Sequence, residues 1–188
     1  VMDTERRSWL ECRIEAADNK RMVGYAVVFN SSSVDLGGFR EIIAPEAVDR
    51  TINEGADVRA LVDHDTSKII GRTRAGTLQL RKDSRGLRVT IEPDMEISYA
   101  RDIMRAVQRG DVSGMSFGFR ALADEWNYDS KTPIRTVTDM KVSEVSVVSF
   151  PAYEKTDIQA AVRSLEAFKQ ANPQRTKQYF DTALRLRR

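Results

Sequence analysis

Three side chains of this sequence, in the order His64, Ser116 and Glu144, have the types that nucleophilic catalysis requires. A serine hydroxyl is a weak nucleophile until an imidazole takes its proton and a carboxylate orients that imidazole. His64 is the only histidine in the 188 residues. Any serine–histidine chemistry in this chain therefore has one candidate base.

Ser116 lies in a glycine-flanked segment, residues 114–118, whose sequence is GMSFG. In an extended strand the two glycines share the face of Ser116, whereas Met115, Phe117 and Phe119 share the opposite face. One face is thus apolar, and the other leaves clearance around a hydroxyl for an approaching carbonyl group. The alternative is that the glycines only permit a bulge or close strand packing.

The same segment also matches the nucleophile elbow of α/β-hydrolases. That motif requires a strand, a sharp turn and a helix, with the histidine after the serine in the chain. Here His64 precedes Ser116, and a strand is expected to follow. The order of the residues excludes that fold.

Glu144 interrupts the apolar run VSEVSVV at residues 142–148. A lone carboxylate in a buried strand is costly unless it is paired or hydrogen-bonded. Pairing with His64 would offset that cost and orient the imidazole. The alternative is a glutamate on an edge strand that faces water.

The alternation of side chains along the strand before His64 argues against a metal site. If that strand stays extended, His64 shares a face with Ala60 and Val62, whereas Asp63 and Asp65 point the other way. The further nitrogen or sulfur ligands common in zinc sites are also missing. The sequence predicts no metal and no cofactor.

Hydrophobic periodicity predicts a β-rich α+β domain, antiparallel in its first half, with interposed helices and a helical C-terminus. Strands are expected at residues 10–14, 23–29, 39–43, 58–62, 69–70, 77–80, 87–91, around Ser116, and at 134–138 and 141–150. Helices are expected at residues 45–54, 96–109 and 157–170. We predict one domain over residues 1–170, with its core at 8–155 and its last helix at 157–170.

Composition narrows the class of protein. Thirty Lys and Arg against 28 Asp and Glu are interspersed, which implies neither nucleic acid nor a membrane as a partner. The single cysteine, Cys12, excludes an intramolecular disulfide and is expected to be a core residue. No apolar run approaches the roughly 20 residues that span a bilayer, so a soluble intracellular protein is expected. Residues 171–188 form a basic tail or processing linker.

Six segments, taken together and in order, resemble one protein family. They are residues 24–30, 38–45, 62–65, 71–73, 113–119 and 144–153, with the sequences GYAVVFN, GFREIIAP, VDHD, GRT, SGMSFGF and EVSVVSFPAY. The series resembles the tailed-phage prohead maturation proteases of the Hong Kong 97 type, distant relatives of the herpesvirus assembly protease. The resemblance covers most of the chain.

The resemblance implies a mainly antiparallel, herpesvirus-protease-like β-barrel surrounded by helices. It also implies a serine endopeptidase with a His-Ser-Glu triad: Ser116 as nucleophile, His64 as base and then acid, and Glu144 as the group that orients the histidine. By analogy with the herpesvirus enzymes, the oxyanion hole is expected near residues 149–154, where Pro151 cannot donate a backbone hydrogen bond.

What the resemblance implies about biology is a protease inside the procapsid, in the cytoplasm of the bacterial host. Its expected partners are the major capsid protein with its scaffold region and, through autocleavage, the protease itself; a homodimer is compatible with the family. Two alternatives stay open. One is a catalytically silent scaffold or capsid-assembly module, and the other is a β-barrel ligand-binding domain, which does not explain Glu144.

Overall fold

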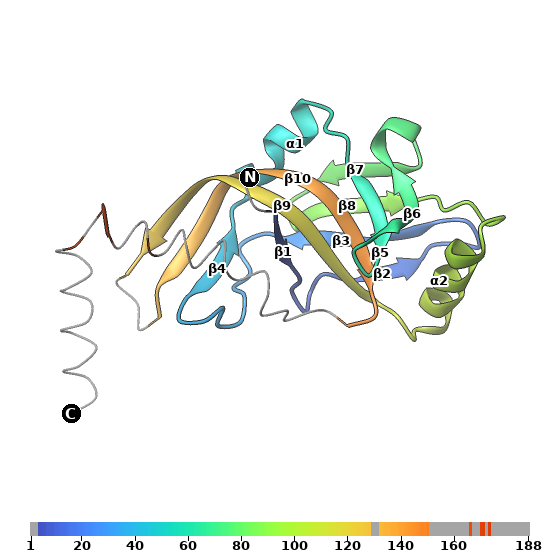
Figure 1. Ribbon diagram of the computed structural model, residues 1–188, viewed down its shortest axis with the longest axis horizontal. Coiled ribbons are helices and arrows are strands. Elements are labelled where there is room, and N and C mark those ends of the chain that lie inside the picture. Colours follow the sequence, from blue (N-terminus) through green and yellow to red (C-terminus); the bar gives the residue numbers. More distant parts are fainter. Residues whose placement is uncertain (1–3, 129–131, 151–165, 167–169, 172, 174–188) are drawn as a thin grey trace.

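The computed structural model describes residues 4–128, 132–150, 166, 170–171 and 173, in which two β-sheets carry most of the structure (Figure 1). The larger sheet has six strands in the order β1-β9-β10-β5-β6, and β4 also pairs with β10. Its strands are β1 (Glu5–Arg7), β4 (Arg40–Ile43), β5 (Arg59–Val62), β6 (Asp65–Arg72), β9 (Gly114–Asn127) and β10 (Ile134–Val148).

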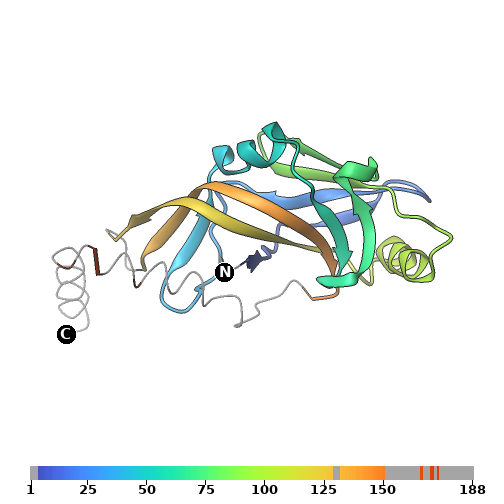
Figure 2. The same ribbon diagram turned by 45° about the horizontal axis from the view of Figure 1, so that its top comes forward.

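The smaller sheet has four strands in the order β2-β3-β8-β7. They are β2 (Ile14–Ala16), β3 (Met22–Val28), β7 (Leu78–Lys82) and β8 (Gly86–Ile91). The helices are the short 3-10 helices η1 (Pro45–Val48) and η2 (Thr73–Ala75), and the α-helices α1 (Asp49–Asn53) and α2 (Ser98–Arg109). Turning the molecule shows α2 at one end and β4 beneath the sweep of β9 and β10 (Figure 2).

This architecture confirms the predicted β-rich α+β class, with mainly antiparallel pairing; β10 is parallel only to β4 and β5. The predicted closed barrel is not found among the described strands, which form two separate sheets. The two sheets bury their apolar sides against each other, as in a sandwich, so the core is sealed without closure of one sheet. The herpesvirus-like arrangement and the domain limits remain predictions.

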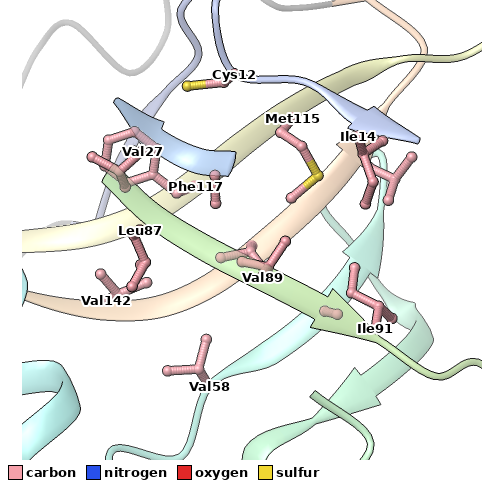
Figure 3. Packing of buried hydrophobic residues seen from close by; sticks show 14 of the residues in the cluster. Cys12, Ile14, Val27, Val58, Leu87, Val89, Ile91, Met115, Phe117 and Val142 are labelled. Carbon is pink, nitrogen blue, oxygen red and sulfur yellow. The ribbon is translucent and has the colours of Figure 1, made fainter. Parts of the chain in front are cut away.

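The core lies between the sheets and explains the alternation read from residues 114–119 (Figure 3). Met115 and Phe117 of β9 are fully buried with Leu87 and Val89 of β8. Because strand side chains alternate, burying Met115 and Phe117 places Ser116 on the opposite face of the larger sheet. The predicted apolar face of this strand is confirmed.

Helix α2 matches its prediction because its apolar residues recur at helical spacing. Ala100, Ile103, Met104 and Val107 are buried, and Gly110 follows the helix with φ of 80°. Glycine adopts this left-handed conformation without a Cβ penalty, and it ends the helix where expected. Among the described residues, no helix has the length and apolar character needed to cross a lipid bilayer.

Several boundaries differ from the prediction. The runs expected at 134–138 and 141–150 are one strand, β10, which bulges between Val137 and Asp139 and again between Val142 and Glu144 instead of breaking. The expected strand at 10–14 is wrong, because the Cys12 amide donates to the Trp9 carbonyl in a turn and β2 begins only at Ile14. Most of the predicted helix at 157–170 and of the tail lies outside the described residues.

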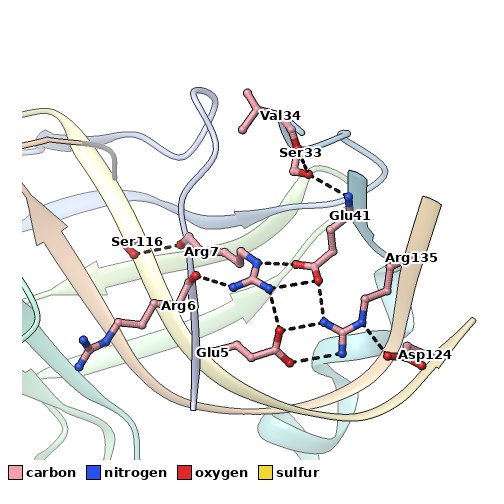
Figure 4. Close-up of polar contacts among 9 residues, drawn as sticks. All are labelled: Glu5, Arg6, Arg7, Ser33, Val34, Glu41, Ser116, Asp124 and Arg135. Carbon is pink, nitrogen blue, oxygen red and sulfur yellow. Dashed lines mark hydrogen bonds and ion pairs between the residues drawn. The ribbon is translucent and has the colours of Figure 1, made fainter. Parts of the chain in front are cut away.

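A buried ionic network fixes the short edge strand β1 to the rest of the larger sheet (Figure 4). Glu5 and Arg7 of β1 alternate with Glu41 and Arg135, and Arg135 Nε also donates to Asp124 Oδ2 at 2.6 Å. Burial by itself would lower the pKa of Arg135, but Glu41 and Glu5 raise that pKa above its ordinary value. Each carboxylate therefore has charged partners, as buried charges require.

Candidate active site

His64 and Glu144, which are 80 positions apart in the chain, meet at the end of β5. His64 Nδ1 lies 2.6 Å from Glu144 Oε1. Glu144 is 8% exposed. An ionised carboxylate only accepts hydrogen bonds, so Nδ1 is the donor in this contact and Nε2 is the ring nitrogen left to act as a base. This contact unites two of the three residues singled out in the sequence.

His64 is positioned by a two-residue turn between β5 and β6, not by an extended strand. Asp63 and His64 have φ of 48° and 59°, and Val62 pairs with Asp65 across the turn. The expectation that His64 continues the alternation of β5 is therefore wrong. Left-handed backbone at two consecutive non-glycine residues costs about 1–2 kcal/mol per residue, and such strain concentrates at functional sites.

Asp63 holds this turn against the end of β10. Its carboxylate accepts hydrogen bonds from the amide and the hydroxyl of Ser149, at 2.8 and 3.0 Å, and its own amide donates to the Val147 carbonyl at 2.9 Å. The Asp63 side chain thereby compensates for the strained backbone. Asp63 thus positions the next residue, His64, next to β10.

Glu144 lies directly opposite Gly118 in the β9–β10 pairing, on the face of the sheet opposite Met115 and Phe117. A Cβ atom built on Gly118 would lie 2.6 Å from Glu144 Oε1, so only glycine leaves room for this carboxylate. Glu144 Oε2 accepts a hydrogen bond from the Ser146 hydroxyl at 2.6 Å, and Arg6 Nε lies 3.6 Å from Oε1. Both oxygens are thus occupied, which limits rotation of the group.

Ser116 shares this face and lies opposite Ser146, two pairs along from Gly118 and Glu144. Its side chain is buried at 1% exposure, and its hydroxyl donates to the Arg7 carbonyl at 3.0 Å (Figure 4). Within the described residues no hydrogen bond joins Ser116 to His64. The structure therefore brings the third candidate residue to the same face, with its hydroxyl turned toward β1.

The region expected to hold the oxyanion hole is described only in part. The Ser149 amide already donates to Asp63, so in this arrangement it is engaged in the turn. Phe150 is exposed, and residues 151–154 lie outside the described residues. The oxyanion donors remain a prediction.

Reasoning from the sequence missed the residues that surround the pair. The sequence could have indicated Ser146, because it lies two positions after Glu144 and so shares its face in a strand. It could not have indicated Arg6 and the Arg7 carbonyl, because β1 reaches the site only through its pairing with β9. Cys12 behaves as predicted: it is buried, and burial raises its thiol pKa to about 12, which disfavours a nucleophilic thiolate.

Comparison with known proteins identifies the class to which this fold and site belong. Residues 8–171 match the family described as caudovirus prohead serine protease. Because the match covers most of the chain, the chain belongs to that family, and the resemblance seen in its sequence segments is confirmed.

Within that class, the chain is 33% identical over 149 residues to the prohead protease of Enterobacteria phage HK97. The alignment covers 76% of this chain and 60% of that protein. The chain thus spans about three fifths of its relative's length. No solved structure is significantly similar to it.

Proposed function

We propose that this chain is a serine endopeptidase of procapsid maturation that uses Ser116, His64 and Glu144. The observation that carries the proposal is the 2.6 Å contact between His64 Nδ1 and the buried Glu144 carboxylate, on the face that also holds Ser116. Family membership supports a serine peptidase. The arrangement supports the role of base for His64 and the role of orienting acid for Glu144.

In the proposed mechanism, His64 Nε2 accepts the Ser116 proton while Oγ attacks the scissile carbonyl carbon. Collapse of the tetrahedral intermediate breaks the C–N bond, and the imidazolium returns the proton to the leaving amine. Water then repeats the sequence on the acyl-enzyme and releases the acid. Glu144 stabilises the transient imidazolium and keeps Nε2 oriented throughout.

The proposal requires a movement of the Ser116 side chain. The Ser116 hydroxyl must leave the Arg7 carbonyl and turn toward His64 Nε2. Rotation about a single side-chain bond between staggered positions is a small change.

The proposed substrates are the scaffold region of the major capsid protein and the protease itself. The proposed place of action is inside the procapsid in the host cytoplasm, with no nucleic acid, membrane, metal or cofactor taking part. A homodimer and removal of residues 171–188 are further parts of this proposal. The HK97 relative is named a prohead protease, which supports the assignment.

The test combines active-site labelling with co-expression. The full chain is treated with a fluorophosphonate, and wild type and Ser116→Ala are each co-expressed with the major capsid protein of the same phage. We expect labelling at Ser116, and capsid-protein trimming in wild type only, both read by intact mass. Ser84→Ala, an exposed change between β7 and β8, serves as the matched serine control. Equal trimming by Ser116→Ala would refute the assignment of the nucleophile.

A second candidate function is the catalytically silent assembly module. One observation favours it: Ser116 is buried and donates to Arg7 rather than to His64. Absence of both labelling and trimming, with normal particle assembly, would select this reading.

A further inference from the structure

A pocket of about 430 Å³ lies between the end of α1, η2 and the middle of β9 and β10. Its volume is within the usual range for binding sites and suits one or two amino-acid side chains. Ser143, which precedes Glu144, lies in its wall. The wall of the pocket therefore includes the sequence neighbour of one proposed catalytic residue.

The acidic side chains of this pocket have cationic partners, whereas its basic side chains lack acidic partners among the described residues. Its two acids are engaged: Glu54 with Arg50 at 3.1 Å, and Asp57 with Arg72 at 2.6 Å. Its three cations, Arg74, Arg120 and Lys141, form no ion pair within 4 Å among the described residues. Arg74 acts on Asp57 only at longer range, as one of the groups that lower the pKa of Asp57. The pocket thus presents net positive charge.

Arg120 gives the most specific indication of a ligand. Its Nε atom is buried and has no hydrogen-bond partner among the described residues. A buried donor without an acceptor is unfavourable, and guanidinium groups pair best with carboxylates. Lys141 lies directly opposite Arg120 in the strand pairing. A carboxylate in the pocket would satisfy both cations.

The strand register relates the pocket to the scissile bond. Ser116, Gly118 and Arg120 follow one another at two-residue spacing on β9 and share one face of the sheet. Ser116 and Arg120 are therefore separated by roughly 13 Å along the strand, at about 3.3 Å per residue. An extended peptide cleaved at Ser116 would reach the pocket three to five residues from the cut.

We propose that this pocket is a specificity subsite in which Arg120 and Lys141 bind an aspartate or glutamate side chain of the peptide substrate. The proposal rests on the proposed function, because it takes Ser116 as the point of cleavage. It assigns an acidic residue three to five positions from the scissile bond.

The first test uses a library of peptides derived from a bacterial proteome, with the cut sites of the full chain identified by mass spectrometry. We expect acidic residues to be enriched about tenfold at one position within three to five residues of the cut. That enrichment should vanish in Arg120→Gln and turn into a preference for Lys or Arg in Lys141→Glu. Arg81→Gln, an exposed change on β7, should leave it unaltered.

The second test is independent of catalysis. Arginine Nε–Hε signals of the full chain are followed by NMR during titration with acetyl-glutamate methylamide or with the glutamine analogue. We expect the Arg120 signal to move with the glutamate compound alone, and to be lost in Arg120→Gln.

The outcomes separate the two proposals. Cleavage without any acidic preference would overturn the subsite and leave the peptidase standing. No cleavage and no fluorophosphonate labelling would remove the peptidase, and the titration would then decide the carboxylate site by itself. An Arg120 signal that responds equally to both compounds, or to neither, would overturn the site.

Discussion

Glu41 and Glu144 are buried carboxylates of the same sheet, but their partners differ in kind. Glu41 is fully buried and accepts hydrogen bonds from Arg7 and Arg135, two guanidinium groups that are themselves buried. Glu144 contacts a histidine on a strained turn, a serine hydroxyl and a half-exposed arginine. Only the second set contains an imidazole, a group that can accept a proton and return it during a reaction.

Buried charge in this one sheet therefore has two different roles. Around Glu41, buried guanidinium groups pair with buried carboxylates, and the network holds β1 in place. Around Glu144, the contact with His64 lets the carboxylate stabilise a positive charge that develops on the imidazole during a reaction. Arg7 links the regions, because its side chain belongs to the first and its carbonyl accepts the Ser116 hydrogen bond of the second.

The largest expected effect comes from removing the base. His64→Asn should lower peptidase activity by about 10⁶-fold, the scale seen when the histidine of a catalytic triad is lost. Asparagine tolerates left-handed backbone, so the turn and the melting temperature should be retained. Steady-state cleavage and thermal melts measure the two quantities. Activity within a few-fold of wild type would exclude His64 as the base.

Glu144→Gln should lower activity by about 10⁴-fold, because the amide favours the wrong imidazole tautomer. Folding should be affected less, since glutamine keeps the shape and can still accept from Ser146. The rate of cleavage, normalised to correctly folded protein, checks this prediction. A large loss of stability with unchanged turnover would make Glu144 a structural residue like Glu41.

Glu41→Gln should show the opposite pattern. Removing one member of a buried charged network leaves its partners uncompensated and costs about 3–5 kcal/mol of unfolding free energy. Turnover per folded molecule should be retained. Denaturant unfolding and fluorophosphonate labelling of the folded fraction test the two halves of the prediction. A selective loss of turnover would mean that β1 controls Ser116 through Arg7.

Gly118→Ala should reduce activity by about 10²-fold, because the new methyl group displaces the Glu144 carboxylate and moves His64. The matched control is Gly76→Ala, at a site where nothing lies near a new Cβ but where φ is 72°. That control should lower stability modestly and spare turnover. Equal turnover losses in both variants would point to general destabilisation.

The smallest effect concerns the pH dependence of a more exposed pair. The hydrogen bonds from Arg72 lower the pKa of Asp57 from its ordinary 3.8 to about 2. The pair therefore stabilises the fold above about pH 4, and this contribution disappears as the pH falls from about 4 to 2. Arg72→Gln should narrow the difference in melting temperature between pH 6 and pH 3. An unchanged difference would show that solvent screens the pair.

Local sequence patterns were enough to predict the strand that carries Ser116 and the direction in which its side chain points. Met115, Phe117 and Phe119 must be buried, and the two-residue period of a strand then sends Ser116 to the other face. Helix α2 and its end at Gly110 followed in the same way from apolar spacing and from the conformational freedom of glycine. These features depend on neighbours within a few positions, which the sequence displays directly.

Only the tertiary structure decided how the site is assembled. His64 reaches Glu144 because Asp63 holds a left-handed turn on the end of β10, and Glu144 fits because the register places it over Gly118. Arg6 and the Arg7 carbonyl enter the site through the pairing of β1 with β9. Such contacts join segments far apart in the chain, and their register follows from the packing of the whole sheet rather than from local residue spacing.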